Sequence, residues 1–331
     1  MAQGFRSSRR AAAALLGCLL LWSCAGASPA GSPASTSSTS PATTVPTTPA
    51  PAAATTTSPT TTSTTTTSTT AAAVTTTAPP APADTKVPPD PLSGEPVSVA
   101  PVFVRALPHD PRAFTQGLVL GDGVFYESTG LYGESTVRIV DPGTGHVIRS
   151  TSLEDGFFGE GLELVGDRLI QLTWREGTAF IWDAETLAPL GAFSYEGEGW
   201  GLCAQEDRLV MSDGSSRLTF RDRTTFEPVG GVEVLRSGEP VERINELECV
   251  EDLVYANVWQ TEEIVVIDPG TGRVVGQIDA SSLLDRLGST DGIDVLNGIA
   301  YDPGDESFYL TGKLWPAVFQ VRLTPEVATD H

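Results

Sequence analysis

The sequence predicts an all-β fold, a five-bladed β-propeller preceded by a disordered tether. The first observation is a repeat in which a residue with a hydrogen-bonding side chain is followed by a small or polar residue and then Leu or Ile. The first residues of the five copies are 44, 40, 45 and 52 positions apart. A period of forty-odd residues built from short strands is typical of a propeller blade. The copies begin at Gln116, Glu160, Trp200, Asn245 and Asn297.

The second observation is the pattern inside each unit. A second hydrophobic strand follows each tripeptide, and in the first four units a third strand ends in a turn that contains Asp. These turns lie in the segments VRIVDPGTG, AFIWDAETL, LTFRDRTTF and IVVIDPGTG, with Asp141, Asp183, Asp222 and Asp268 in register. The fifth unit closes without Asp, as VFQVRL. Each unit therefore predicts one small antiparallel sheet that buries its faces against its neighbours.

The geometry of a propeller gives the first residue of each repeat a special position. The strand that follows a blade crossover is the innermost, so equivalent residues of successive blades ring the mouth of the central channel. We expect the five repeat-start residues to face one another there. That set holds one carboxylate, Glu160, with three carboxamides and an indole. The alternative is that such a residue only ends its strand and meets solvent.

The N-terminal segment has the features of an export signal. Three arginines within residues 1–10 precede an almost wholly apolar run at 11–22, too short for a transmembrane helix. The sequence Leu-Trp-Ser-Cys resembles a bacterial lipoprotein box, which makes residues 1–24 a signal peptide of lipoprotein type with Cys24 as the lipid-modified residue. Ala25-Gly26-Ala27 offers an ordinary cleavage site as the alternative, so the chain is expected to be lipid-anchored outside the cytoplasm or secreted.

Residues 25–97 are mostly Ser, Thr, Pro and Ala and show no hydrophobic periodicity. Such a segment cannot bury enough apolar surface to offset its conformational entropy, so we expect a disordered linker. Residues 98–331 then form the catalytic propeller domain, which is long enough for one domain and short for two. Closed propellers expose only short sheet edges, so a monomer is expected.

The acidic charge excludes one class of partner. The chain has 42 acidic and 20 basic residues; without the three arginines of the signal, 17 minus 42 gives a formal net charge of −25. An acidic surface repels phosphate backbones and anionic lipid, so we expect no nucleic-acid partner and no membrane contact beyond a lipid anchor.

Cysteine and histidine usage limits the possible mechanisms. Cys203 and Cys249 lie just inside the innermost strands of adjacent blades, where they could pair as a disulfide or remain buried thiols. The histidines are His109, His146 and His331, which cannot assemble a cluster with zinc-ligand spacing. We therefore expect neither a metal nor a cofactor, and a Ser-His-Asp hydrolase is disfavoured.

Aromatic residues gather at the expected channel mouth. Trp174, Trp259 and Trp315 follow the second strands of their units, and Trp200 begins the third repeat. Tryptophan at a strand end is often a packing plug, and Trp182 fits that description best. Several indoles around one carboxylate, however, predict an apolar pocket with a few convergent polar groups, the usual form of a small-ligand site.

At these residues the chain resembles the plant-type glutaminyl-peptide cyclotransferases, also called glutamine cyclotransferases, which are five-bladed propellers. The resemblance runs from about His109 to Leu323 and includes AFTQGL, FGEGLEL, QLTW, GWGL, NELE, ANVW, LNGIAYD and TGKLWP in order. It implies conversion of N-terminal glutamine of peptides or proteins to pyroglutamate with release of ammonia. It also implies Glu160 as the proton-transfer residue within a pocket formed by Phe114, Gln116, Phe158, Trp174, Trp200, Asn245, Trp259 and Lys313.

The residue types suit this reaction on chemical grounds. The substrate's α-ammonium must lose a proton before the amine attacks its own side-chain carboxamide, and ammonia must gain one to leave, so one carboxyl can do both. Lys313 and the amides of Asn245 or Gln116 are suitable donors to the oxyanion. Two alternatives stay open: a calcium-dependent propeller lactonase or esterase, which would want several acidic or Asn ligands at one depth, and a non-catalytic extracellular binding propeller.

Overall fold

The computed structural model describes residues 94–325, and this part of the chain is nearly all-β. The expected signal peptide, Cys24 and most of the expected linker lie outside the described residues. Within the described part the only helical element is a short 3-10 helix, η1 (Ser281–Arg286). No helix in that range is long and apolar enough to cross a membrane.

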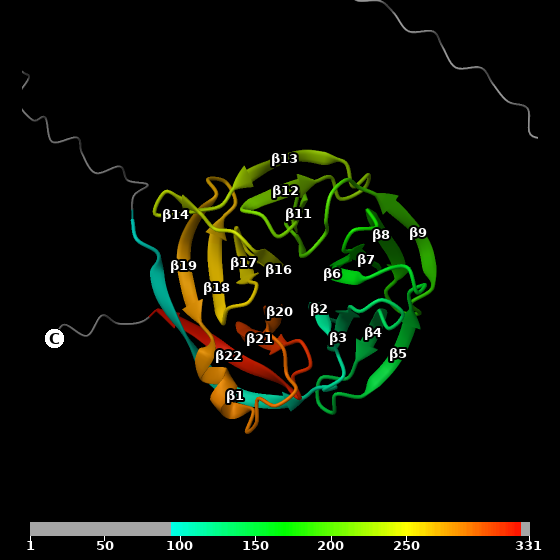
Figure 1. Cartoon of the computed structure of the whole chain (residues 1–331), viewed down its shortest axis with the longest axis horizontal. Coiled ribbons are helices and arrows are strands. Elements are labelled where there is room, and N and C mark those ends of the chain that lie inside the picture. Colours follow the sequence, from blue (N-terminus) through cyan, green and yellow to red (C-terminus); the bar gives the residue numbers. More distant parts are fainter. Residues whose placement is uncertain (1–93, 326–331) are drawn as a thin grey trace, which may run out of the picture. The chain divides into compact units, whose positions relative to one another are not determined.

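Three separate antiparallel sheets of four strands follow one another along the chain and around a central axis (Figure 1). In each sheet the strands pair in sequence order, as hydrophobic strands joined by tight turns are expected to do. The first sheet holds β2 (Thr115–Gly121), β3 (Val124–Thr129), β4 (Thr136–Val140) and β5 (Val147–Ser152). The second holds β6 (Gly159–Val165), β7 (Arg168–Thr173), β8 (Thr178–Asp183) and β9 (Pro189–Ser194). The third holds β10 (Leu202–Ala204), β11 (Leu209–Ser212), β12 (Arg217–Arg221) and β13 (Pro228–Glu233).

The rest of the ring is one ten-stranded sheet made of two four-stranded halves and a hairpin. One half holds β16 (Ile244–Val250), β17 (Leu253–Val258), β18 (Glu263–Asp268) and β19 (Arg273–Asp279). The other holds β20 (Leu296–Asp302), β21 (Ser307–Gly312), β22 (Ala317–Pro325) and β1 (Val97–Pro108). The hairpin of β14 (Leu235–Arg236) and β15 (Glu239–Pro240) pairs with β19.

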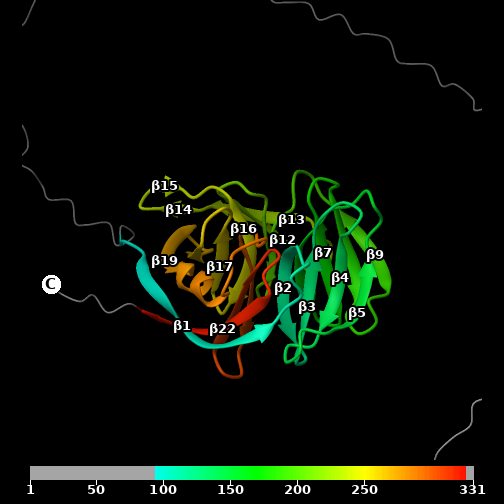
Figure 2. The same ribbon diagram turned by 60° about the horizontal axis from the view of Figure 1, so that its bottom comes forward.

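The first and last described strands close the ring. The N-terminal strand β1 pairs antiparallel with the C-terminal β22 and is the outermost strand of its half (Figure 2). It also pairs in parallel with β19 over Val97, Ser98 and Val99. This arrangement explains why the fifth repeat lacks an Asp turn: its outer strand comes from the start of the folded region, so no turn into a fourth strand is needed.

The four Asp turns have the geometry that the sequence predicts. Each Asp is the last residue of the third strand of its unit or comes directly after that strand. Its Oδ1 accepts a backbone N–H two or three residues ahead, at 2.8 Å in every case. An Asp that bonds its own backbone in this way pre-forms a turn, which is why the residue recurs at this place. The donors are Thr144, Thr186, Thr225 and Gly270.

Close packing of the inner strands explains the small second residue of the repeat. A Cβ on Gly117 would lie 2.5 Å from the backbone nitrogen of Leu162, and a Cβ on Gly161 would lie 2.7 Å from the carbonyl oxygen of Trp200. The inner strands therefore approach too closely for a side chain at these positions. The fourth repeat instead carries Glu246, whose buried carboxylate accepts N–H groups of Leu118 at 3.2 Å and Ile299 at 2.8 Å.

Hydrophobic clusters lie between neighbouring sheets, and a disulfide adds a covalent link across one boundary. Cys203 on β10 and Cys249 on β16 are bonded, with their Cα atoms 5.4 Å apart. Of the two states that the sequence left open, the structure has the disulfide. Trp182 is buried in the cluster between the first two sheets, as the packing-plug interpretation predicts.

Candidate active site

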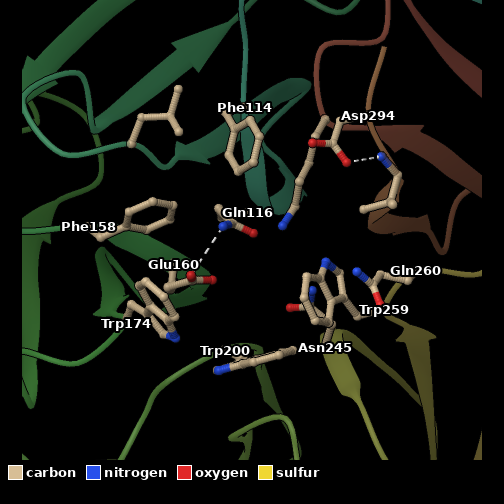
Figure 3. Close-up of a pocket in the computed structure, with 13 residues that line it drawn as sticks. Phe114, Gln116, Phe158, Glu160, Trp174, Trp200, Asn245, Trp259, Gln260 and Asp294 are labelled. Carbon is tan, nitrogen blue, oxygen red and sulfur yellow. Dashed lines mark hydrogen bonds between the residues drawn. The ribbon is translucent and has the colours of Figure 1, made fainter. Parts of the chain in front are cut away.

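One pocket of about 380 Å³ lies where the inner strands begin and the second strands end (Figure 3). Five aromatic residues line it, together with two carboxyl groups, one ammonium and three carboxamides. The lining residues are Phe114, Gln116, Leu131, Phe158, Glu160, Trp174, Trp200, Asn245, Trp259, Gln260, Asp294, Val295 and Lys313. All nine pocket residues that the sequence nominated are among them.

Asn297 is the repeat-start residue that does not line the pocket, so the prediction that all five face one another was wrong for this one. Asn297 is fully buried, and its Nδ2 donates to the carbonyl of Thr115 at 3.0 Å and to Gln116 Oε1 at 3.3 Å. Its side chain therefore supports β2 from behind the pocket.

Trp315 also lies away from the pocket, contrary to the expectation of four indoles near one carboxylate. The chain adopts a left-handed conformation at Leu314 (φ 62°), which turns consecutive side chains to different sides. Lys313 faces the pocket, whereas Trp315 is fully buried, packs on Phe319 and donates its indole N–H to the carbonyl of Asp294 at 2.8 Å.

Glu160 is the buried carboxyl of the pocket. It is the second residue of β6, is 5% exposed, and accepts a hydrogen bond from Gln116 Nε2 at 3.1 Å. Burial raises the pKa of Glu160 well above its usual range, the charge of Lys313 opposes the rise, and Glu176 and Glu198 add to it. A raised pKa makes a carboxyl hold its proton more readily than an exposed one does, which suits a group that must both accept and return a proton.

Lys313 is the buried cation of the pocket. Its ammonium lies 4.9 Å from the centre of the Phe114 ring. Burial lowers the pKa of Lys313 below its usual value, while Glu160 and Asp294 act in the opposite direction. Within residues 94–325 no carboxylate lies within ion-pair distance of this ammonium. Its donors are therefore free to meet an oxygen of a bound molecule.

The carboxamides of Gln116 and Asn245 differ in how many of their polar atoms already have a hydrogen-bond partner. Gln116 is held on both sides, since its Nε2 donates to Glu160 and its Oε1 accepts from Asn297. Asn245 is buried, and its Oδ1 has no hydrogen-bond partner among the described residues. A buried polar atom without a partner is costly, so the Asn245 amide is available to a ligand.

The aromatic wall consists of two groups of rings in contact. Phe158 packs edge-on against Phe114 at 6.3 Å and against Trp174 at 5.6 Å between ring centres. Trp200 packs perpendicular to Trp259 at 5.5 Å. Rings packed in this way give the pocket apolar walls, and electrostatic interactions are stronger in such a low-dielectric environment than in water.

Four lining residues were missed by the sequence reasoning: Leu131, Gln260, Asp294 and Val295. They lie in loops outside the repeated strands, where the repeat-start tripeptide gives no register. The left-handed backbone of Leu131 (φ 88°) and Gln260 (φ 65°) aims these side chains, and φ is not readable from a non-glycine residue.

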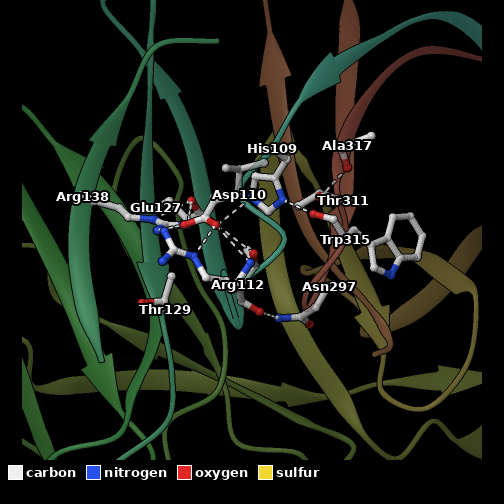
Figure 4. Close-up of polar contacts among 12 residues, drawn as sticks. His109, Asp110, Arg112, Glu127, Thr129, Arg138, Asn297, Thr311, Trp315 and Ala317 are labelled. Carbon is white, nitrogen blue, oxygen red and sulfur yellow. Dashed lines mark hydrogen bonds and ion pairs between the residues drawn. The ribbon is translucent and has the colours of Figure 1, made fainter. Parts of the chain in front are cut away.

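A buried ionic network supports the two loops that carry Phe114 and Lys313 (Figure 4). His109 donates from Nδ1 to the carbonyl of Trp315 at 2.7 Å and from Nε2 to Glu127 at 2.9 Å. Both partners accept only, so both ring nitrogens carry protons and the ring is an imidazolium. Arg138 donates to the other oxygen of Glu127 at 2.9 Å. The loops also meet directly, since Leu314 donates its N–H to the carbonyl of Ala113 at 2.7 Å.

The charges in this network depend on one another. Burial alone would raise the pKa of Glu127, but the charges of Arg138 and His109 lower it to about 2. Burial also disfavours the charged form of His109, yet Glu127 raises the pKa of the imidazole above 6.5. Removing one partner of a buried pair leaves the other charge uncompensated, which is strongly destabilising.

We expect Glu127→Gln to lower the free energy of unfolding by about 3–5 kcal/mol. The difference from the parent should be greatest between pH 4.5 and 6.5. The pKa of Glu127 is depressed in the folded state, so its contribution is lost as the pH falls from 4.5 toward about 2. The pKa of His109 is raised, so its contribution is complete below 6.5 and lost as the pH rises through the folded value. Denaturant unfolding across this range checks the prediction; a loss below about 1 kcal/mol, the size of a surface pair, would contradict it.

Groups of three or more His, Cys, Asp or Glu side chains that could hold a metal ion do not occur within residues 94–325. The lining of the pocket instead combines carboxyl groups, an ammonium and carboxamides with aromatic rings. A pocket of this size, with apolar walls and a few polar groups, is the usual form of a site for a small ligand.

Comparison with known proteins identifies the family. Residues 67–323 match the family model described as glutamine cyclotransferase. A glutaminyl-peptide cyclotransferase of Arabidopsis thaliana is 42% identical over 224 residues, which cover 66% of this chain and 70% of that protein. The crystal structure of Myxococcus xanthus glutaminyl cyclase is 44% identical, with a TM-score of 0.67, and the match covers 70% of this chain and 100% of that one. The chain belongs to the glutamine cyclotransferase family.

Proposed function

We propose that this protein is a glutaminyl-peptide cyclotransferase that converts the N-terminal glutamine of peptides or proteins to pyroglutamate and releases ammonia. The observation that carries the proposal is Glu160, a buried carboxyl of raised pKa at the base of an aromatic pocket that also holds an unpaired ammonium. Membership of the family supports it.

The fold that suits this function is a five-bladed propeller. Four strands to a blade and five repeats would use every long strand of the described chain, with β1 completing the fifth blade beside β22. The innermost strands β2, β6 and β16 then bring Gln116, Glu160 and Asn245 to one channel mouth, with Trp200 just ahead of β10.

The first step moves a proton from the substrate to the protein. A glutaminyl N-terminus enters the pocket as an α-ammonium, and the carboxylate of Glu160 takes one of its protons. The Oδ1 of Asn245 is free to accept another N–H of the same amine and orient it. The neutral nitrogen then attacks the side-chain carboxamide carbon of its own residue, forming the C–N bond of a five-membered ring.

The second step returns the proton. Attack places negative charge on the carboxamide oxygen, and the ammonium of Lys313 and the amide N–H of Asn245 stabilise it. Glu160 gives its proton to the departing nitrogen and then takes the second proton of the ring nitrogen. The C–N bond to the departing nitrogen breaks, and ammonia takes that second proton from Glu160 and leaves as ammonium. The lactam remains on the peptide and Glu160 is again a carboxylate. The aromatic wall holds the extended side chain in the folded-back shape that ring closure needs, so orientation contributes to the rate.

The nature of the nucleophile gives a direct test of this proposal. A Gln-initiated dipeptide with a free amine should release ammonia with the protein present, whereas the same peptide with an acetylated amine should release none. A dipeptide that begins with Asn should also be inert, because its carboxamide is one methylene too short for a five-membered lactam. Ammonia from the acetylated peptide would indicate an amidase instead.

We expect prolonged dialysis against a strong chelator to leave the turnover number unchanged. The proposed proton transfer needs only Glu160, and the charge on the intermediate is met by Lys313 and Asn245. Turnover before and after dialysis, with thermal unfolding measured alongside, checks this prediction. Loss of turnover that zinc restores without a change in unfolding would contradict it.

The sequence also supports proposals about the rest of the chain. The basic and apolar start with Cys24 favours export and a lipid anchor on the outer face of the membrane, with secretion as the alternative. The Ser-, Thr-, Pro- and Ala-rich residues that follow would act as a tether for a monomeric catalytic domain.

A further inference from the structure

We propose that Glu198 is a positioning residue of this pocket, and that its carboxylate holds the indole rings of Trp174 and Trp200 in the orientation that accepts the substrate. Glu198 precedes the third inner strand and does not itself line the pocket. It acts through the two rings that do. The proposal rests on the proposed function, because the substrate in question is a glutaminyl N-terminus.

The carboxylate contacts both indoles directly. The Nε1 atoms of Trp174 and Trp200 donate to the same oxygen, Oε2, at 2.7 Å and 3.0 Å. The other oxygen accepts from Arg175 Nε at 2.9 Å, and the guanidinium of Arg175 lies 3.7 Å from the centre of the Trp174 ring. Hydrogen bonds to an ionised acceptor are about twice as strong as neutral ones, so they fix ring orientation well.

Glu198 joins the two halves of the aromatic wall. One half is the run of contacts from Phe114 through Phe158 to Trp174, and the other is the pair of Trp200 and Trp259. No ring contact among residues 94–325 connects Trp174 to Trp200. The carboxylate fills that gap, so the relative orientation of the halves depends on it.

The backbone fixes the carboxylate between the rings. Gly199 donates its N–H to the carbonyl of Trp174 at 2.9 Å, and Trp200 donates its own to Ser212 at 3.0 Å. A Cβ on Gly199 would lie 2.9 Å from the carbonyl oxygen of Thr173, so the loop can lie this close to β7 only without a side chain there.

The charge of Glu198 has a second consequence. Burial alone would raise the pKa of Glu198, but hydrogen bonds from Trp200, Arg175 and Trp174 lower it, so the group is ionised at neutral pH. Its negative charge in turn raises the pKa of Glu160. Mutation can separate the effect on ring orientation from the effect of charge. Both indole N–H groups donate to one oxygen of Glu198, and the amide of a glutamine would keep one such oxygen while removing the charge.

The experiment compares Glu198→Gln with Glu198→Leu on a Gln-initiated dipeptide. Glu198→Gln keeps an oxygen for both indoles, so KM should stay near the parent value, and the acidic limb of the kcat–pH profile should move to lower pH because Glu160 loses a negative neighbour. Glu198→Leu frees both rings and should lower kcat/KM by about a hundredfold, the effect of misplacing a bound substrate by about 1 Å. Glu196→Leu is the matched control; it removes an exposed carboxylate of the same loop and should cost less than about fivefold.

Near-ultraviolet circular dichroism gives a readout that needs no substrate. The indole bands should change in Glu198→Leu and stay in Glu198→Gln. The proposal would be overturned if Glu198→Leu folds, keeps the indole bands of the parent and has a kcat/KM within about twofold of the parent. A change that small is less than rings free to reorient would cause. If the parent releases no ammonia, the proposed function fails, and the bands alone then decide whether Glu198 orients the rings.

A second set of variants serves if Glu198→Leu does not fold. Trp174→Phe and Trp200→Phe keep an aromatic ring but remove one donor each. In a protein that carries both Phe substitutions, Glu198→Gln should still shift the kcat–pH profile, because the charge near Glu160 is still removed. Glu198→Ala should no longer change KM there, because no indole N–H is left to lose its acceptor. A KM effect of Glu198→Ala that is as large in this background as in the parent would overturn the proposal, because it could not pass through the indole N–H groups.

Discussion

Glu160→Gln should fold like the parent and lose almost all cyclisation activity. The substitution keeps the size of the side chain and its contact with Gln116 but removes the group that accepts and returns a proton. General acid–base catalysis is usually worth about 10² to 10⁴ in rate, so kcat should fall by at least about a hundredfold. The fold should not weaken, since burial disfavours the charged form of Glu160.

The measurement is ammonia release from a Gln-initiated dipeptide, with thermal unfolding recorded alongside. Glu154→Gln is the matched control, because Glu154 is an exposed carboxylate in the loop that leads into the same strand. Activity within about tenfold of the parent in a normally folded Glu160→Gln would remove Glu160 from the proton-transfer role.

Lys313→Met should lower turnover by about 10² to 10³, the cost of losing one oxyanion donor. Methionine keeps most of the apolar stem that packs beside Phe114 and removes only the ammonium. Because the oxyanion exists only after attack, kcat should fall much more than substrate affinity. A second effect should appear in the pH profile: without the Lys313 charge, which lowers the pKa of Glu160, any residual activity should need a higher pH.

Steady-state kinetics on the dipeptide check this prediction, and Arg273→Met controls for the loss of one surface cation. Arg273 is the first residue of β19, and its guanidinium donates to the carbonyl of Gly94 at 3.3 Å. Equal and small effects at both positions would exclude Lys313 from the site and leave the amides as the donors to the oxyanion.

The repeat carried most of the information about the fold. Because each of the first four units has its own hydrophobic strands and its own Asp turn, the three four-stranded sheets and the half formed by β16–β19 could be predicted from local signals. The closure could not, since β1 pairs with β22 at the other end of the folded region and contact across that distance has no local pattern. The disulfide was left open for a related reason: spacing alone does not give the 5.4 Å between the Cα atoms of Cys203 and Cys249.

The residues around the pocket also differ in whether the repeat alone predicts their position. Gln116, Glu160, Trp200 and Asn245 follow from the repeat, because equivalent positions in a ring of sheets meet at one end. Asn297 has the same register but turns behind β2, where it bonds the backbone of Thr115. Its environment depends on a neighbouring strand and not on its own unit.

Glu198 shows what sequence reasoning missed and what signal was present. It lies outside the repeat position, in a loop, so the register gave it no role. Its place two residues before Trp200 was visible in the sequence, and a carboxylate that close to an indole could have suggested a hydrogen bond. That it also bonds Trp174, from the preceding sheet, required the fold.

The central claim is that one pocket performs ring closure and ammonia release with a single proton-transfer group. The most direct test measures ammonia and pyroglutamyl product together, in one reaction of the parent protein with a Gln-initiated dipeptide, against the spontaneous rate without protein. The account predicts equal amounts of the two products, formed at a rate that Glu160→Gln reduces toward background. A folded protein that forms neither product above background, or that releases ammonia without forming the lactam, would contradict it.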